Sequence, residues 1–180
     1  MEIEINKTDL RKRIRQALKG MSKEQCVNES QNIWSQLEHD PVFEKAETIL
    51  LYWSLENEVE TRPFIEKWSN RKKILLPVVI GDILVLRVYE GVALMREGAY
   101  GILEPQGREW EDYGNIDLCI IPGVGFDKEG HRMGHGKGYY DRLLNRLHAT
   151  TYGICFSTQL ADKIPTDPWD IGVDKVIYPL

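Results

Sequence analysis

The sequence predicts an α/β fold with three layers, in which a mainly parallel sheet is flanked by helices on both faces. Short, continuously apolar segments such as Thr48–Trp53 and Asp117–Pro122 are typical of strands that are buried on both faces. Segments in which apolar residues recur at helical spacing alternate with these strands along the chain. The length suits one substantial domain, which we expect to span residues 1–180.

Two helices are expected at the start of the chain. Apolar residues recur at helical spacing over residues 7–21, and Gly20 is placed to end that helix. Ser22 and Gln25 have the spacing of a capping box, which predicts the start of a second helix. Asp40-Pro41 should end it, because a proline disfavours helical backbone at the residue before it.

A helix and two strands are expected after the strand at residues 48–53. Thr61 is a candidate N-cap, and Pro63 suits the first turn of the helix that follows. Lys73–Val79 predicts the next strand. Gly81-Asp82 then predicts a hairpin-like return into a strand over Ile83–Tyr89.

The second half of the chain is expected to contain three more strands and a helix. Residues 91–110 are rich in Gly, Glu and Pro and predict a loop. The strand at Asp117–Pro122 follows, then a helix over Tyr139–Leu147 and strands over Thr151–Phe156 and Asp174–Tyr178. In such sheets ligands bind beyond the carboxyl ends of the strands, so the loops that leave those ends are expected to converge.

Composition argues against several classes of protein. The net charge of −5 disfavours a nucleic-acid partner, because such binding relies on clustered cations. The sequence contains no run of about 18 apolar residues, so it predicts no membrane span. Residues 1–7 lack the apolar core of a signal peptide. Cys26, Cys119 and Cys155 are odd in number and widely spaced, unlike a disulfide framework. We expect a cytoplasmic monomer without nucleic-acid or membrane partners.

The segment Pro122–Asp141 carries the strongest functional signal. Six of the fifteen glycines of the chain lie in it, between a predicted strand and a predicted helix. Bare backbone amides and the positive end of the helix dipole can bind phosphate there, and Arg132 and Lys137 add cationic side chains. The spacing matches neither a Walker A loop nor a Rossmann fingerprint. The alternative interpretation is a flexible surface turn.

Carboxylates and a basic helix face are further candidates for this chemistry. Asp141, in the first turn of its helix, could interact with the helix dipole or serve as an oxygen ligand for Mg²⁺. Either Asp170 or Asp174, four residues apart, could complete such a metal site. Lys7, Arg11 and Arg15 recur every four residues and form one cationic stripe. That stripe is a solvated helix face or a clamp on phosphate; a third interpretation, nucleic-acid binding, is disfavoured because the chain as a whole is acidic.

Glu58 follows the strand that ends at Trp53 and could orient a flat heterocycle through its N–H donors. The alternative is an acidic loop that only adds solubility. His131 and His135 are four residues apart, but on a glycine-rich loop, which is not a metal-binding spacing. No nucleophile elbow is present.

The chain resembles the 5-formyltetrahydrofolate cyclo-ligase family, also called 5,10-methenyltetrahydrofolate synthetases. Four of its segments match the family, and they occur in the same order along the chain. The most specific match joins Pro122–Asp127 with Gly134–Arg142, and the supporting segments are Lys7–Arg11, Glu58–Thr61 and Gly98–Pro105. The resemblance implies one α/β domain with a Rossmann-like sheet. It also implies an enzyme that uses Mg-ATP to convert 5-formyltetrahydrofolate into 5,10-methenyltetrahydrofolate, with release of ADP and phosphate.

The resemblance also implies the residues of the sites. The metal, Mg²⁺, is expected at Asp141 and Asp170. The positions that match the ATP site are Lys7, Arg11, Arg132, Met133, Gly134, His135, Gly136, Lys137, Gly138, Tyr139 and Tyr140. The positions that match the folate site are Trp53, Glu58, His135, Gly136, Lys137, Gly138 and Tyr139.

The chemistry suggests catalytic roles for three of these residues. Phosphorylation of the formyl oxygen gives an iminium phosphate, which the neighbouring N10 amine attacks, so the protein mainly positions groups and stabilises charge. We expect the loop amides with Arg132 and Lys137 to hold the transferring phosphoryl group, and Tyr139 or Trp53 to pack against the pterin. The alternatives are a binding protein without turnover and a sugar-phosphate isomerase that uses Glu129 as its base.

Overall fold

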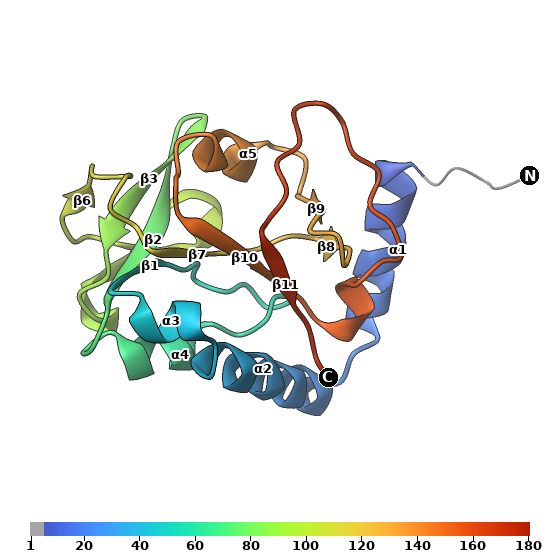
Figure 1. The fold of residues 1–180 in the computed structure, drawn as a ribbon, viewed down its shortest axis with the longest axis horizontal. Coiled ribbons are helices and arrows are strands. Elements are labelled where there is room, and N and C mark those ends of the chain that lie inside the picture. The colour runs from blue at the N-terminus through green and yellow to red at the C-terminus, as the bar shows by residue number, and fades with distance from the viewer. Residues whose placement is uncertain (1–5) are drawn as a thin grey trace, which may run out of the picture.

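A seven-stranded sheet forms the centre of this computed structural model, which describes residues 6–180 (Figure 1). In spatial order its strands are β11 (Lys175–Ile177), β10 (Thr150–Ile154), β7 (Leu118–Ile121), β1 (Thr48–Leu50), β2 (Lys73–Ile80), β3 (Ile83–Val88) and β6 (Glu109–Trp110). The first five pair in parallel, whereas β3 pairs antiparallel with both β2 and β6. The predicted mainly parallel sheet is therefore confirmed. Residues 1–5, part of the segment that lacked a signal-peptide core, lie outside the described residues.

Helices lie on both faces of this sheet, as the sequence predicts. They are α1 (Lys7–Lys19), α2 (Lys23–Glu38), α3 (Pro41–Lys45), α4 (Arg62–Trp68) and α5 (Tyr139–Leu144). In Figure 1, α2, α3 and α4 lie below the sheet, α5 lies above it and α1 stands at its right-hand end. Within residues 6–180 no helix combines the length and apolar character that crossing a membrane requires.

Apolar side chains form a core on each face of the sheet. Side chains alternate between the two faces of a strand. Ile49, Ile74 and Leu118 therefore pack in the core that includes α2, α3 and α4, while Leu50 and Cys119 pack in the core that includes α5. Burial on both faces explains why the central strands have continuously apolar sequences rather than alternating ones.

The starts of α1, α2 and α3 are capped by side chains, whereas α4 and α5 have no side-chain cap. Ser22 and Gln25 form both hydrogen bonds of the predicted capping box at α2. Asp40 accepts a hydrogen bond from the amide of Val42, so the predicted helix stop also begins the short helix α3, which the sequence analysis missed. Thr61 occupies the N-cap position of α4 as predicted, but not through its side chain. Its hydroxyl makes no cap and instead donates to the carbonyl oxygen of Tyr52 at 2.6 Å.

Several short elements occupy segments that were expected to be loops. Residues 91–110 contain the helical turns η1 (Val92–Leu94) and η2 (Ala99–Gly101) and the hairpin strands β4 (Met95–Glu97) and β5 (Leu103–Pro105), besides β6. The glycine-rich segment contains a ribbon made of β8 (Gly125–Phe126) and β9 (Arg132–Met133). Strands of two or three residues are too short to show periodicity, so turn-rich composition alone predicted a loop.

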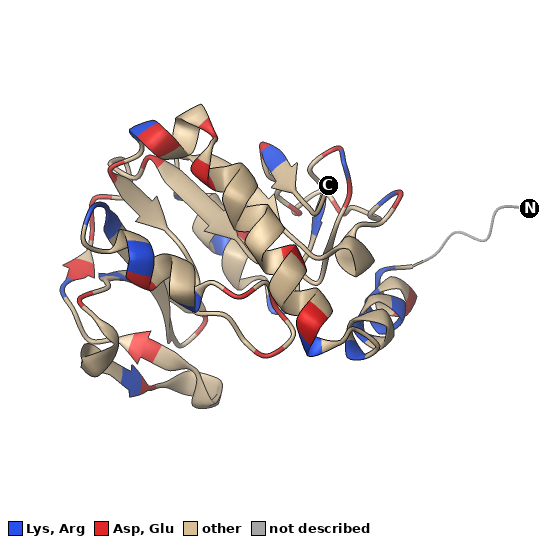
Figure 2. Ribbon diagram, turned by 90° about the horizontal axis from the view of Figure 1, so that it is seen from below, with Lys and Arg blue, Asp and Glu red and all other residues tan. Residues whose placement is uncertain are grey.

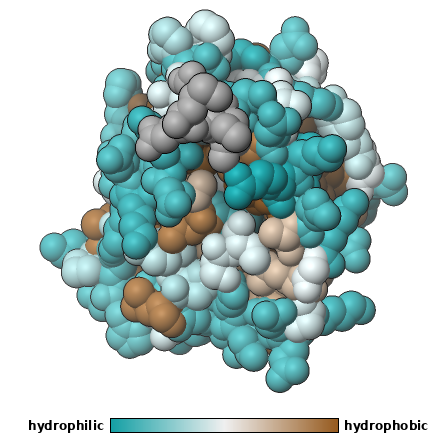
Figure 3. Space-filling view, turned by 90° about the vertical axis from the view of Figure 1, so that its right-hand side faces the viewer, coloured by the Kyte–Doolittle hydropathy of each residue, from teal (hydrophilic) through white to brown (hydrophobic). Residues whose placement is uncertain are grey.

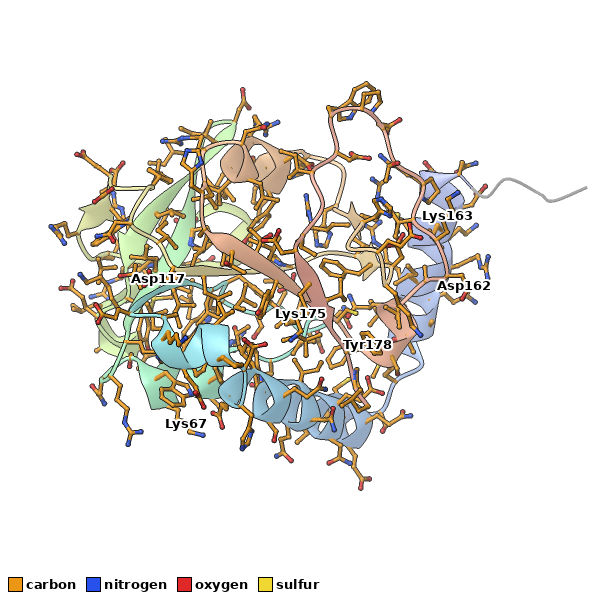
Figure 4. The ribbon with its side chains drawn as sticks, in the orientation of Figure 1. Lys67, Asp117, Asp162, Lys163, Lys175 and Tyr178 are labelled. Carbon is orange, nitrogen blue, oxygen red and sulfur yellow. The ribbon has the colours of Figure 1, made fainter. Side chains whose placement is uncertain are left out.

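The amino ends of the parallel strands carry structural polar contacts. Asp117, at the left in Figure 4, precedes β7 and accepts hydrogen bonds from the amides of Glu47 and Thr48 at 2.8 Å each. These bonds join the beginnings of β7 and β1. The carboxyl ends of the two strands lie at the opposite edge of the sheet.

Candidate functional site

A cavity of about 900 Å³ opens at the carboxyl ends of β1 and β7. The two strands are parallel neighbours, so the loops that follow them meet at one edge, as predicted. Every residue that matches the family's ATP, folate or metal positions lines this cavity. Figure 3 shows the end of the molecule that α1 occupies, where hydrophilic surface surrounds separate apolar patches.

The glycine loop, residues 134–138, forms the middle of the cavity wall. Gly136 and Gly138 have φ angles of +100° and +68°, which residues with a Cβ adopt only with strain. Open space surrounds the position that a Cβ on Gly136 would occupy. The loop therefore owes its path to the backbone freedom of glycine and exposes main chain to the cavity.

Arg132 lies beneath this loop, and its side chain is only 3% exposed. One guanidinium nitrogen donates to Asp141 Oδ1 at 3.1 Å and the other to the carbonyl oxygen of Pro122 at 3.4 Å. Its Nε is buried without a hydrogen-bond partner among the described residues. The structure thus places Arg132 where it holds the carboxylate of Asp141 against the end of β7.

The second predicted metal residue, Asp170, lines the same cavity. Asp170 and Asp167 both form ion pairs with Lys7, at the start of α1. Partial burial would raise the pKa of Asp170, but hydrogen bonds from Lys7 and from the amide of Asp167 lower it overall. The amide of Ile171 donates to Asp141 Oδ1 at 3.2 Å and so links the two predicted metal residues.

The basic stripe on α1 is divided by the fold. Figure 2 shows Lys and Arg along this helix. Arg11 turns to the glycine loop, where its Nε donates to the carbonyl oxygen of Gly134 at 2.8 Å. Lys7 and Arg11 line the cavity, but Arg15 does not and remains exposed. Only Lys7 and Arg11 are therefore placed where a clamp on a ligand would require them, and the clamp itself stays a prediction.

Trp53 and Glu58 lie at the other end of the cavity, after β1. Trp53 is 8% exposed, and its indole Nε1 is buried without a partner in the part of the chain that is described. Glu58 Oε2 accepts a hydrogen bond from the amide of Leu55 at 2.9 Å, and Glu58 Oε1 lies 3.9 Å from His135 Nε2. A carboxylate and an apolar ring thus converge on the same space.

Residues of the β4–β5 hairpin complete this end of the wall. The ammonium of Lys137 lies 3.8 Å from the ring centroid of Tyr100. The hydroxyl of Tyr139 donates to the carbonyl oxygen of Gly81 at 3.2 Å and lies 3.5 Å from the hydroxyl of Tyr100. Tyr100 has a φ of +60°, an uncommon conformation for a residue with a Cβ.

Several residues that line the cavity had no predicted role, among them Tyr100, Glu104, Asp167 and Trp169. Glu104 is 8% exposed and accepts a hydrogen bond from the amide of Val79 at 3.1 Å. Tyr100 and Glu104 belong to the supporting segment at residues 98–105, which was the available signal. No motif marked Asp167 or Trp169.

The residues around His131 form a separate cluster. Asp127, Glu129 and His131 are the one group of three in residues 6–180 with the spacing for a metal. Asp127 already accepts hydrogen bonds from the amides of Glu129, His131 and Ile164 and from the His131 ring, which holds the turn between β8 and β9. Glu129 does not line the cavity, so the geometry offers no support for an isomerase base there.

Comparison with known proteins points to one family. The sequence model of the 5-formyltetrahydrofolate cyclo-ligase family matches residues 3–179. The 5-formyltetrahydrofolate cyclo-ligase of Mus musculus is 31% identical over 96% of this chain and 93% of that protein. The Escherichia coli (strain K12) protein of the same name is 32% identical over 92% of this chain and 96% of that protein. The solved structure of Aquifex aeolicus 5,10-methenyltetrahydrofolate synthetase superposes with a TM-score of 0.87 at 35% identity, covering 96% and 89% of the two chains.

Proposed function

The chain is an enzyme of the 5-formyltetrahydrofolate cyclo-ligase family, and we propose that its cavity binds Mg-ATP beside 5-formyltetrahydrofolate during the reaction. The convergence of two chemically different ends on one glycine loop carries this proposal. One end presents cations and carboxylates from α1 and the segment before β11. The other presents aromatic rings and Glu58.

The proposed reaction forms a carbon–nitrogen bond at the expense of the γ-phosphate of ATP. The formyl oxygen attacks the γ-phosphorus, ADP departs, and an iminium phosphate forms on N5. The N10 amine then attacks the formyl carbon and loses its proton, and phosphate leaves with the former formyl oxygen. The products are 5,10-methenyltetrahydrofolate, ADP and phosphate. No covalent bond to the protein is needed, so positioning and charge stabilisation are its main tasks.

The nucleotide end has the chemistry of a triphosphate site. Lys7 and Arg11 supply positive charge from the first turns of α1, and Arg11 already contacts the loop through the carbonyl oxygen of Gly134. The exposed backbone of residues 134–138 lies between these cations and the folate end. We propose that the loop and Lys137 contact the phosphoryl group as it moves from ATP to the formyl oxygen.

Asp141 and Asp170 fit a magnesium ion that is bound together with nucleotide phosphates. Oδ1 of Asp141 accepts hydrogen bonds from Arg132 and from the amide of Ile171. Oδ2 of Asp170 accepts hydrogen bonds from Lys7 and from the amide of Asp167. The second oxygens, Oδ2 of Asp141 and Oδ1 of Asp170, accept no hydrogen bond from residues 6–180. Bound magnesium would neutralise phosphate charge, and these two oxygens would hold it.

The buried position of Arg132 suggests how it contributes. Its guanidinium fixes Asp141 through the 3.1 Å hydrogen bond and supports the wall below the loop. We propose that Arg132 acts mainly by positioning Asp141, and that Lys137, which is more accessible, makes the direct contact with phosphate. This refines the expectation that both cations hold the phosphoryl group.

At the folate end, Glu58 is the candidate for pterin recognition. Its carboxylate is held by the amide of Leu55 and lies at the cavity wall, where it can accept hydrogen bonds from the amino and N–H groups of a pterin. Trp53 and Tyr139 supply flat apolar surface around that position.

The proposal is tested by mixing the protein with 5-formyltetrahydrofolate and Mg-ATP and following the near-ultraviolet absorbance of the methenyl product. We expect absorbance to rise only when nucleotide and divalent metal are both present. A rise that is independent of ATP would contradict the use of ATP. Calorimetric binding of both ligands without any rise would instead identify a binding protein that lacks turnover.

A further inference from the structure

Trp169 is a large apolar side chain that the fold leaves in water. It is 71% exposed, more than any other tryptophan in the described part of the chain. The other four tryptophans lie in or against the apolar cores. A tryptophan offers 150–250 Å² of surface for burial, so an exposed indole ring at the edge of a ligand cavity invites a functional explanation.

The backbone on both sides of Trp169 is held in place. The amide of Asp170 donates to the carbonyl oxygen of Asp167 at 3.0 Å, and the amide of Asp167 donates to Asp170 Oδ2 at 2.7 Å. Both aspartates also pair with Lys7 on α1. The indole ring therefore projects from a closed turn that is attached to the first helix.

This turn belongs to a segment that frames one end of the cavity. After η3 (Ser157–Gln159) the chain passes beside α1, rises above the sheet and returns as β11 (Figure 1). Asp162 and Lys163 begin this passage next to α1, at the right in Figure 4. The turn that carries Trp169 follows them and contributes Asp167, Trp169 and Asp170 to the cavity wall.

The surroundings of Trp169 define what it could bind. Among the described residues, α1 and the chain after β10 give the cavity several charged side chains but a single aromatic ring, that of Trp169. Lys7 and Arg11 suit phosphate, and Asp141 and Asp170 suit a metal. A ligand with phosphates on these groups and a flat heterocycle beyond them would place that heterocycle next to the indole.

We propose that Trp169 stacks on the adenine ring of ATP. This inference rests on the proposed use of ATP and adds the residue that binds the base. Stacking on an aromatic side chain suits a purine because every base has a π-face, and it requires no hydrogen-bonding partner. This role would account for the exposure of the ring, for its fixed turn and for its place between two aspartates that pair with Lys7.

The test measures binding of Mg-ADP and of Mg-tripolyphosphate, which lacks a base, by calorimetry without folate. Trp169→Ala should weaken Mg-ADP binding about tenfold or more and leave tripolyphosphate binding within twofold of the unchanged protein. Trp169→Phe should retain most of the affinity for ADP. Val92→Ala, which removes an exposed apolar side chain outside the cavity, should bind both probes normally.

Fluorescence gives a second readout. Mg-ADP should quench tryptophan emission in the unchanged protein and in Val92→Ala, and this quenching should be lost in Trp169→Phe although ADP still binds. The melting temperature of Trp169→Ala should stay close to that of the unchanged protein because the ring is exposed.

Three results would overturn the inference, and they differ from one another. Equal weakening of ADP and tripolyphosphate by Trp169→Ala would show that the residue only shapes the turn. Normal ADP binding by Trp169→Ala would show that the ring serves another purpose, such as docking of a protein partner. If the unchanged protein bound tripolyphosphate but not ADP, the nucleotide assignment itself would fail.

Discussion

Replacement of Arg132 by alanine should weaken both the folding of the protein and the turnover of each folded molecule. The guanidinium is almost fully buried and donates to Asp141, whose side chain is 23% exposed. Breaking a buried ion pair from one side costs about 3–5 kcal/mol, and the partial exposure of Asp141 places the expected loss near the lower limit, at about 3 kcal/mol. With an unfolding entropy of about 2.1 cal/mol/K per residue, this loss lowers Tm by about 8 °C.

The effect on turnover follows from the position of Asp141. Without its guanidinium partner, this carboxylate keeps one hydrogen bond, from the amide of Ile171, and loses the contact that aligns it with the glycine loop. We expect turnover per folded molecule to fall by at least tenfold. Methenyl formation should be measured at a temperature well below the Tm of the variant, with the folded fraction taken from circular dichroism.

A surface arginine supplies the matched control. Arg146 is exposed, lies outside the cavity and contacts Tyr113 with its guanidinium 4.2 Å from the ring centroid. Arg146→Ala should cost no more than about 1 kcal/mol and leave turnover unchanged. An Arg132→Ala protein with unchanged Tm would refute the buried-pair reasoning. A lower Tm with normal turnover per folded molecule would show that Arg132 is structural only.

Three further predictions concern the folate end, the glycine loop and the cysteines. Glu58→Gln should raise KM for 5-formyltetrahydrofolate at least tenfold without changing Mg-ADP affinity, whereas Glu60→Gln, in the same loop but outside the cavity, should change neither. Gly136→Ala should lower the unfolding free energy by about 1–2 kcal/mol in chemical denaturation, because its φ of +100° strains a residue with a Cβ; an unchanged midpoint would contradict this. Burial raises the pKa of the Cys119 and Cys155 thiols to about 12, so both should resist a thiol reagent at pH 8 until the protein unfolds. Because unfolded thiols ionise from about pH 9, their contribution to stability should disappear as pH rises from about 9 to 12.

Local sequence predicted the elements whose causes are local or strongly periodic. The capping box at Ser22 and Gln25 and the hairpin at Gly81-Asp82 each depend on neighbouring residues, and both formed as expected. The central strands were recognised because burial on both faces requires continuous apolar segments. Thr61 makes no side-chain cap because its hydroxyl found a partner in Tyr52, nine residues away, instead of the helix start.

The residues that line the cavity could be predicted where the topology of the sheet determines which loops meet. Parallel strands end at one edge of a sheet, so the loops after β1 and β7 had to lie close together. Other cavity residues, Tyr100 and Glu104 among them, had no predicted role. Tyr100 and Glu104 reach the cavity from a hairpin whose strands are too short to have a periodic sequence.

The sequence by itself determined the mainly parallel sheet, the glycine loop at its edge and the family to which the chain belongs. Only the tertiary structure decided how charges are paired: Lys7 with Asp167 and Asp170, and Arg132 beneath the loop with Asp141. The members of the Lys7 pairs are about 160 residues apart in the chain. Helix and strand patterns arise from neighbouring residues, whereas the burial of an arginine or the exposure of Trp169 depends on which distant segments the fold brings beside it.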